Sequence, residues 1–309
     1  MIYSHNPTII RLEGFSMVDF ENLHNVTIIM KYIKNKSLYD IIFNRKEEEI
    51  QNSYTNTNLQ IILIGVARGM KYLNEHNIIH RDLKPGNVLI DDNFHPIITD
   101  FGLSKFVEDV DTKEHSICLG TLKYMSPEII LSEKYGKSSD VYAFGILMYE
   151  VLTQNHPYHE LGEIAPFALN NKIIEGTRPT ITPQIKSSLG QLMQKCWSGN
   201  PGERPTFKEI YNNLTSNDYF LDDVNQEEIN SYIESISKEN DQVEFLLRQN
   251  EKLEEENSEL KKEICQLKET IGTATQPPDE LDQKKEEETQ LTKDTEELNA
   301  EKNTINKRH

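Results

Sequence analysis

The sequence has few of the features that mark secreted or membrane proteins. Its 309 residues include three cysteines, Cys118, Cys196 and Cys265, which lie too far apart for a metal motif and suggest no disulfide framework. No run of about 18 apolar residues is present, so we expect no membrane-spanning helix. The first residues lack a basic segment followed by an apolar one, so we expect no signal peptide and a cytoplasmic location.

Basic residues are also scarce. The chain has 33 Lys and Arg against 51 Asp and Glu, a formal net charge of −18. Most of this charge, −14, lies after residue 215, where 26 acidic side chains accompany 12 basic ones. Nucleic acids and anionic membranes both bind basic protein surfaces, so we expect neither as a partner. The chain therefore divides into a nearly balanced first part and an acidic extension.

Hydrophobic periodicity predicts a few strands followed by many helices. Short β-branched runs indicate strands, and apolar side chains at three- and four-residue steps indicate helices. This order of elements predicts an α+β fold that is mainly helical. The expected elements are strands at 8–12 and 27–33, a hairpin of 87–90 with 96–99, and helices at 58–76, 140–152, 185–196 and 206–214.

A heptad pattern follows residue 239. Leucine occupies every d position and asparagine two a positions, which favours a parallel two-stranded coiled coil. In such a dimer Glu256 would face Lys261 of the other chain. We therefore expect a homodimer through residues 243–271; the alternative is one amphipathic helix packed on the domain. The a and d positions are Val243, Leu246, Asn250, Leu253, Asn257, Leu260, Ile264, Leu267 and Ile271.

The segments on either side of the heptads can also be predicted. Weaker heptad matches at Ile229, Tyr232 and Ile236 suggest that the helix extends upstream, although Glu239 would occupy a d position. Downstream, Gly272 and two prolines end the helix, and the remaining residues carry scarcely any large apolar side chains. The expected segments are a globular domain at 1–215, a helical linker at 216–238, a parallel coiled coil at 239–272 and a disordered acidic tail at 273–309.

Two loops in the first part carry groups suited to phosphoryl transfer. Residues 80–87 read HRDLKPGN, and residues 100–102 read DFG. The carboxylate of Asp82 could take a hydroxyl proton, while the amide of Asn87 and the carboxylate of Asp100 could hold a metal ion. Phosphoryl transfer depends more on such positioning and charge neutralisation than on covalent catalysis.

These loops and the segments after them resemble the protein kinase family. Residues 120–128, GTLKYMSPE, resemble the end of its activation segment, and residues 139–145, SDVYAFG, resemble its buried central helix. Residues 201–207, PGERPTF, resemble a C-terminal landmark of the family. The resemblance covers residues 5–215 and implies a protein-kinase-like fold lacking most of the N-lobe. Residues 65–73 look most like those of the tyrosine-kinase-like group, which phosphorylates serine and threonine.

The resemblance implies roles for the loop residues. Asp82 would orient the substrate hydroxyl and accept its proton, and Lys84 would lie against the transferred phosphate. Asn87 and Asp100 would hold Mg²⁺ on the phosphates of ATP. Lys84 and Thr121 both favour serine/threonine specificity, which implies a protein substrate with these residues.

The resemblance also implies a nucleotide site. Met30 would be the gatekeeper at the end of the last N-lobe strand. The hinge backbone of Lys31, Tyr32 and Ile33 would meet the adenine edge, and Leu89 would lie under the ring. The same apolar residues would also suit any protein core.

Two further features follow from the resemblance. Arg81 would be paired by a phosphate on Thr112 or Ser116, although these could also be ordinary loop hydroxyls. Glu128 and Arg204 would form a buried ion pair that supports the C-lobe.

A Gly-rich loop, a strand lysine and a helix glutamate would precede the strand that residues 6–12 resemble, and the sequence contains none of them. One interpretation is an N-terminally incomplete reading of an active kinase, which the intact Asp82, Lys84, Asn87 and Asp100 favour. The second is a catalytically inactive pseudokinase scaffold. The third is a structural coiled-coil protein with a vestigial lobe.

The missing strands also predict exposed apolar surface. Without further strands in the sheet, Ile9, Ile10, Ile28 and Ile29 should be exposed unless another element covers them.

Overall fold

The computed structural model describes residues 6–21, 23–34, 36–44, 55–100, 105–106, 119–132 and 135–274. Its residues form two compact units, Met1–Val243 and Glu244–His309, which we describe separately. Several residues singled out above lie outside the described part: Phe101, Gly102, Thr112, Ser116, Cys118, the side chain of Thr121 and the tail from residue 275 onwards.

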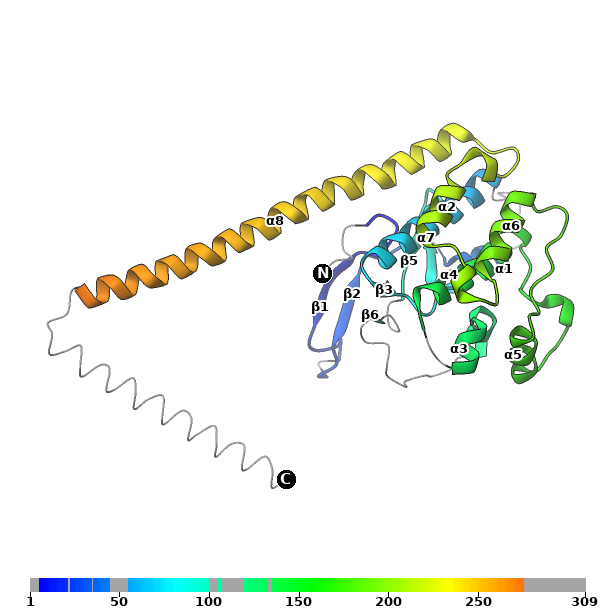
Figure 1. Cartoon of the computed structure of the whole chain (residues 1–309), viewed down its shortest axis with the longest axis horizontal. Helices are drawn as coiled ribbons and strands as arrows, with labels where there is room; N and C mark the ends of the chain where they lie inside the picture. The colour runs from blue at the N-terminus through cyan, green and yellow to red at the C-terminus, as the bar shows by residue number, and fades with distance from the viewer. Residues whose placement is uncertain are drawn as a thin grey trace, which may run out of the picture. The chain divides into compact units, whose positions relative to one another are not determined.

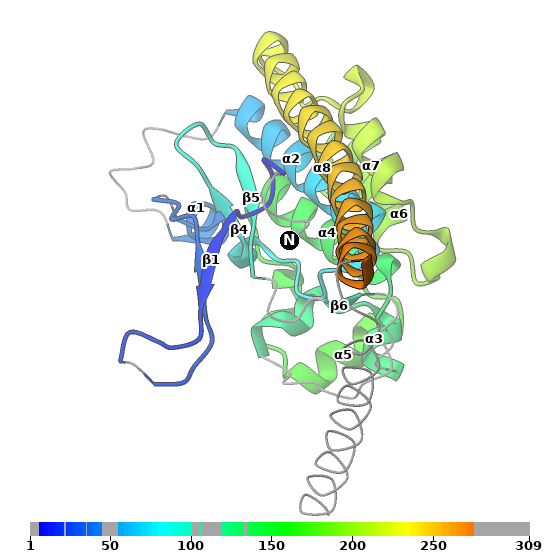
Figure 2. The same ribbon diagram turned by 90° about the vertical axis from the view of Figure 1, so that its left-hand side faces the viewer.

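The described strands of the first unit form three antiparallel pairs. The predicted hairpin of residues 87–90 and 96–99 is confirmed, because Val88 lies opposite Ile98 and Leu89 opposite Ile97. The hairpin of β1 and β2 extends away from the helices (Figure 2). The pairs are β1 (Leu12–Ser16) with β2 (Thr27–Met30), β3 (Ile78–Ile79) with β6 (Lys105–Phe106), and β4 (Val88–Ile90) with β5 (Pro96–Ile98).

The strand predicted at residues 8–12 is wrong. Ile9 and Ile10 are buried against β5, where Ile10 N–H donates to the carbonyl of Ile98 at 2.8 Å. Ile9 forms a single isolated bridge with Ile98. The β-branched run therefore reflects burial. Strand β5 covers these two residues, which is the exception that the expectation of exposure allowed.

The exposure expected on β2 is confirmed. Ile28 and Ile29 are 62% and 49% exposed. Phe15, the β1 residue opposite Ile28, is 65% exposed, and Met30, two residues further along β2, is 47% exposed. Because side chains two residues apart share a face of a strand, Phe15, Ile28 and Met30 form one apolar face. We call these three residues the hairpin face.

The remaining described elements are helical, and the last of them, α8, begins in the first unit and continues into the second. Helices α2, α4, α6 and α7 pack together (Figure 1). The α-helices are α1 (Leu38–Phe43), α2 (Asn56–Glu75), α3 (Pro127–Ser132), α4 (Lys137–Thr153), α5 (Pro166–Ile174), α6 (Ser187–Cys196), α7 (Phe207–Leu214) and α8 (Gln226–Ala274). The 3-10 turns are η2 (Pro85–Asn87), η5 (Leu119–Tyr124), η6 (His159–Leu161), η7 (Pro201–Glu203) and η8 (Asn217–Tyr219).

Helix α2 is the centre of the core and confirms the helix predicted at 58–76. It begins with a capping box, in which the Thr55 hydroxyl accepts the Asn58 N–H and the Asn58 side chain accepts the Thr55 N–H. Its residues 57–70 are all buried. Helix α4 is buried on nearly all sides, as the apolar residues around most of its circumference predict. These two helices support the loops around Asp82.

The first turns of α8 belong to this core. The helix extends upstream as expected, and Ile229, Tyr232 and Ile236 are buried core residues of the first unit. Tyr232 packs on His95, with the ring centres 4.5 Å apart. Gly65 of α2 makes room for it, because a Cβ atom there would collide with the Tyr232 hydroxyl.

Replacing Tyr232 with phenylalanine should not destabilise the protein. The Tyr232 hydroxyl is buried and has no hydrogen-bond partner, and such a group costs about 1–3 kcal/mol. We therefore expect Tyr232→Phe to leave the free energy of unfolding unchanged or to raise it by about 1 kcal/mol. Urea unfolding measures this, with Tyr211→Phe as the control. A loss above about 1 kcal/mol would show that the hydroxyl has a partner.

The described side chains of the second unit leave an apolar stripe uncovered. Leu253, Leu260, Ile264 and Leu267 of α8 are 51–60% exposed. Their spacing matches the predicted a and d positions. None of the helices in the described ranges is long and apolar enough to cross a membrane.

Candidate active site

Asp82 lies at the centre of a small polar cluster that the sequence predicted. Its Oδ2 atom accepts hydrogen bonds from Lys84 Nζ at 2.6 Å and Asn87 Nδ2 at 2.9 Å. Asn87 Nδ2 also donates to the Asp82 carbonyl at 2.7 Å. The loop from β3 to β4 therefore brings Asp82, Lys84 and Asn87 together.

The second carboxylate oxygen of Asp82 has a different environment. Oδ1 is buried and has no hydrogen-bond partner, and Asp82 as a whole is 7% exposed. A buried acceptor without a partner is unfavourable, so its persistence suggests a role. Oδ1 can accept a hydrogen bond from a hydroxyl group that enters the site.

Helix α4 holds the loop that carries Asp82 through hydrogen bonds to its backbone. Asp140, in the first turn of α4, accepts the backbone N–H groups of His80 at 2.8 Å and Arg81 at 2.9 Å. Burial raises the pKa of Asp140 to about 7, although the two N–H donors oppose this shift. Sequence reasoning placed Asp140 on a buried helix but gave it no role; an acidic residue at the start of a mainly apolar helix was the available signal.

His80 supports Asp82 as a neutral residue. It is fully buried, and burial lowers its pKa. Its Nε2 lies 3.1 Å from the Thr99 carbonyl, which can only accept, so we assign the proton to Nε2. Nδ1 then accepts the Asp82 N–H at 3.3 Å. His80 therefore orients the backbone of Asp82 and does not carry a proton to substrate.

Two residues beside the cluster have strained backbones. Arg81 and Asp100 have φ angles of 70° and 64°, in the left-handed region. Each such residue costs about 1–3 kcal/mol and must be held by its surroundings. The Thr99 N–H donates to the Asn87 carbonyl at 2.9 Å, which places Asp100 next to the end of η2.

The oxygen groups of Asn87 and Asp100 suit Mg²⁺. Asn87 uses Nδ2 for its hydrogen bonds to Asp82, so its Oδ1 can face a cation. Asp100 is exposed at the same end of the β4–β5 hairpin. No cluster of three or more His, Cys, Asp or Glu side chains with metal-binding geometry occurs in the described residues. Mg²⁺ is commonly held by one or two protein groups together with phosphate oxygens, so the two residues fit it.

The predicted nucleotide residues belong to β2, the segment after it and β4. Met30 ends β2, and Lys31 and Tyr32 after it are exposed, while Ile33 is half-buried. Leu89 is half-buried in β4 and forms a backbone bridge to Ser37 before α1. The structure shows no direct contact that tests their proposed roles.

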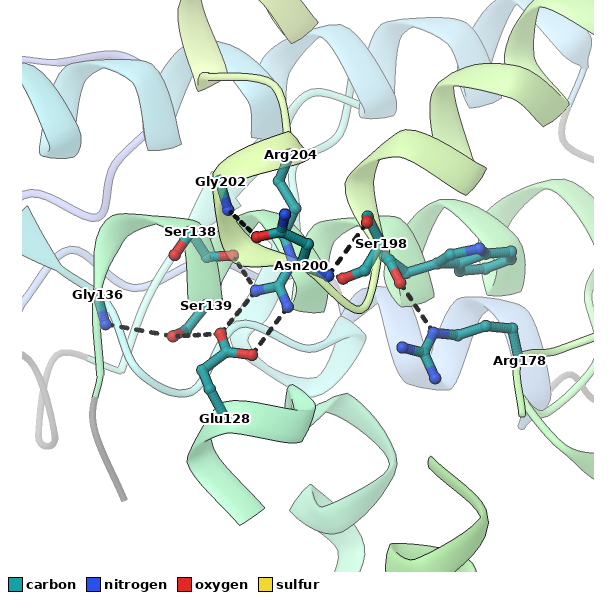
Figure 3. Close-up of polar contacts among 10 residues, drawn as sticks. Glu128, Gly136, Ser138, Ser139, Arg178, Ser198, Asn200, Gly202 and Arg204 are labelled. Carbon is teal, nitrogen blue, oxygen red and sulfur yellow. Dashed lines mark hydrogen bonds and ion pairs between the residues drawn. The ribbon is translucent and has the colours of Figure 1, made fainter. Parts of the chain in front are cut away.

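Glu128 and Arg204 form the ion pair expected from the resemblance (Figure 3). Arg204 Nη1 and Nη2 donate to the two carboxylate oxygens of Glu128 at 2.6 and 2.8 Å. The remaining donors reach the carbonyls of Ser138 at 3.0 Å and Ser198 at 2.9 Å. The Arg204 side chain is fully buried, and the pair joins α3, the start of α4 and the loop after η7.

A second carboxylate, Glu150, was not singled out from the sequence. It is fully buried in α4, and its Oε2 accepts the Tyr124 hydroxyl at 2.8 Å. His156 Nδ1 lies 3.9 Å from Oε1, and the His156 ring stacks on Phe43 with centres 3.9 Å apart. Burial raises the pKa of Glu150 to about 8 and lowers that of His156. Both groups are thus mostly neutral at pH 7, and their contact is not an ion pair.

The buried Glu150 should make stability depend on pH. A carboxyl whose pKa is raised on folding stabilises the folded state below its unfolded pKa of 4.5, and this stability is lost as the pH rises to about 8. We expect the free energy of unfolding to fall less between pH 5.5 and 8.5 in Glu150→Gln than in the unchanged protein. Urea unfolding at both pH values tests this. The prediction would be contradicted if the free energy of unfolding fell equally in Glu150→Gln and the unchanged protein. It would also be contradicted if the exposed control Glu175→Gln showed the same change as Glu150→Gln.

Comparisons with known proteins agree with the geometry. A family model described as protein tyrosine and serine/threonine kinase matches residues 1–214. A probable serine/threonine-protein kinase of Dictyostelium discoideum is 32% identical over 212 residues, which are 68% of this chain and 15% of that protein. A probable LIM domain-containing serine/threonine-protein kinase of the same organism is 33% identical over 214 residues, 69% of this chain and 31% of that protein.

A dual specificity protein kinase of Dictyostelium discoideum is also similar, with 32% identity over 187 residues. These residues are 60% of this chain and 28% of that protein. In each case the matched region spans less than a third of the relative's length.

Proposed function

The chain belongs to the protein tyrosine and serine/threonine kinase family, and from this premise we propose that it transfers the γ-phosphate of ATP to a hydroxyl group of a protein substrate. The observation that carries the proposal is the buried Oδ1 of Asp82, which has no partner while Oδ2 has two. This asymmetry leaves one oxygen for the attacking hydroxyl and fixes the other.

Each residue of the cluster has a distinct role in this proposal. Mg-ATP, when bound, supplies the phosphoryl group and part of the charge neutralisation. Asp82 orients the hydroxyl and accepts its proton at Oδ1. Lys84 places a positive charge 2.6 Å from Asp82, close to where negative charge develops. Asn87 and Asp100 hold Mg²⁺ through their oxygen atoms.

The adenine would bind between β2 and the β4–β5 hairpin. We assign the hinge backbone of Lys31, Tyr32 and Ile33 to the adenine edge, with Met30 as the gatekeeper and Leu89 beneath the ring. Exposure of Lys31 and Tyr32 supports the assignment, because a ligand can reach these residues.

We assign serine and threonine as the acceptor residues and place the chain in the tyrosine-kinase-like group. Lys84 supports this assignment, since the resemblance puts such a lysine in serine/threonine kinases. The names of the relatives include both serine/threonine and dual specificity kinases, so tyrosine peptides belong in the test.

A cleft beside η5 would receive the protein substrate. A cavity of about 630 Å³ is lined by residues of η5, of the segment around η6 and of α5. Its wall includes Leu122 and Lys123, while the neighbouring Tyr124 and Met125 line the small pocket at Asp82. η5 therefore connects the cleft with Asp82, as a bound peptide would require.

We further propose that residues 243–271 form a parallel homodimeric coiled coil in the cytoplasm. The exposed Leu253, Leu260, Ile264 and Leu267 would be buried in such a dimer. Sedimentation of the full chain tests the proposal: a dimer is expected, and Leu253→Glu with Leu260→Glu should give a monomer. A monomer of the unchanged chain at high concentration would contradict it.

The alternative function is that of a catalytically inactive scaffold. The hairpin face favours it, because exposed contiguous apolar residues commonly mark a surface that binds another protein. A scaffold would not require an intact Asp82 cluster, so we place it second.

The deciding experiment incubates the full chain with Mg-ATP and with peptides that contain serine, threonine or tyrosine. We expect phosphate on serine and threonine peptides and none without Mg²⁺. Nucleotide binding is measured in parallel. Binding of Mg-ATP without transfer to any peptide would favour the scaffold.

A further inference from the structure

The partner of Arg81 is a residue that the sequence did not point to. The guanidinium carbon of Arg81 lies 4.3 Å from the centre of the Tyr135 ring, which is the distance of a cation–π contact. Tyr135 lies just before α4, and the resemblance had suggested a phosphate for Arg81 instead. The described structure thus provides a partner for this cation within the folded chain.

Electrostatics agree with the contact. Burial raises the pKa of Tyr135, while the charge of Arg81 and a hydrogen bond to it lower this pKa. The Nε atom of Arg81 is buried and has no hydrogen-bond partner, so the ring is the group that compensates this part of the cation. Tyr135 therefore interacts directly with the charge of Arg81.

The contact acts at a strained point of the catalytic loop. Arg81 directly precedes Asp82 and has a left-handed backbone with φ of 70°. Its N–H is held by Asp140, and its side chain is held by Tyr135. These two contacts hold the backbone and the side chain of Arg81, and hence the peptide that carries Asp82.

We propose that Tyr135 is a positioning residue, which holds Arg81 so that the catalytic loop keeps its geometry without a phosphate on the activation segment. This inference rests on the proposed phosphoryl transfer. It implies that the loop is ordered in the unphosphorylated chain. It also implies that Tyr135 acts through Arg81 and contacts no substrate.

Three variants of the full chain test the proposal after phosphatase treatment. Tyr135→Leu removes the ring, Tyr135→Phe keeps it, and Tyr219→Leu makes the same change at another half-buried tyrosine. We expect Tyr135→Leu to lower kcat about tenfold with little change in the KM for ATP, because the proposal gives Tyr135 no contact with ATP. Tyr135→Phe and Tyr219→Leu should stay within about threefold of the unchanged chain.

A double-mutant cycle distinguishes positioning from a general loss of stability. If Tyr135 acts through Arg81, Tyr135→Leu should have no further effect on kcat in an Arg81→Ala background. Independent, multiplicative effects would overturn the proposal. So would a phosphatase-treated unchanged chain with the low kcat of Tyr135→Leu, since a phosphate would then be the partner of Arg81.

Amide hydrogen exchange measures the effect of Tyr135 on the catalytic loop without any assay of phosphate transfer. The peptide of residues 78–87 should exchange faster in Tyr135→Leu than in Tyr135→Phe or Tyr219→Leu, with global unfolding measured for each. If the unchanged chain transfers no phosphate, the proposed function fails, but this comparison still decides the role of Tyr135. Equal exchange in all variants would overturn it.

Discussion

Replacing Asp82 with asparagine is expected to slow phosphate transfer at least about a hundredfold, because a general base contributes about 10²–10⁴ to the rate. Asparagine has nearly the same shape and can still accept hydrogen bonds from Lys84 and Asn87 through its amide oxygen. Its amide nitrogen cannot accept a proton at the position of Oδ1. Initial rates with Mg-ATP and a serine peptide measure the effect.

A matched control separates chemistry from folding. Asp92→Asn makes the same change at an exposed turn residue between β4 and β5, and we expect it to leave the rate unchanged. Circular dichroism and Mg-ATP affinity should be similar in both variants. Transfer that survives in Asp82→Asn would remove the role given to Asp82, whatever the control shows.

Local motifs were well predicted because they depend on neighbouring residues. The cluster of Asp82, Lys84 and Asn87 spans six positions, so one loop conformation brings its members together. Helix α2 was equally clear, since its apolar positions repeat over the whole length of the helix. Such features need little information from distant parts of the chain.

Features set by distant contacts were misread or missed. Ile9 and Ile10 look like strand residues, but their burial against β5 explains their type. The burial of Tyr232 was missed, because a helix with one buried face shows the same spacing as a weak heptad. The contacts of Arg81 with Tyr135 and of Tyr124 with Glu150 join separate segments, and no local pattern specifies them.

The largest effect on stability is expected at Arg204. Arg204→Met should lower the free energy of unfolding by about 3–5 kcal/mol, because it leaves the Glu128 carboxylate without its partner. It also leaves the carbonyls of Ser138 and Ser198 without a donor, as the contacts in Figure 3 show. Urea unfolding measures the loss. Arg11→Met is the matched control, since Arg11 pairs with Glu13 while 60% exposed, and it should cost less than about 1 kcal/mol.

The double variant Glu128→Leu, Arg204→Met shows whether the unpaired charge causes the loss. Removing both charges of a buried pair is less harmful than removing one, so the double variant should be more stable than Arg204→Met.

The pKa of Glu128 gives a second test. Burial alone would raise this pKa, but the hydrogen bonds and the charge of Arg204 bring it below 4.5. The pair therefore stabilises the fold above the unfolded pKa of 4.5, and this contribution is lost as the pH falls through the folded pKa. The acid-induced loss should be smaller in Arg204→Met; an equal loss would mean that the Glu128 pKa does not depend on Arg204.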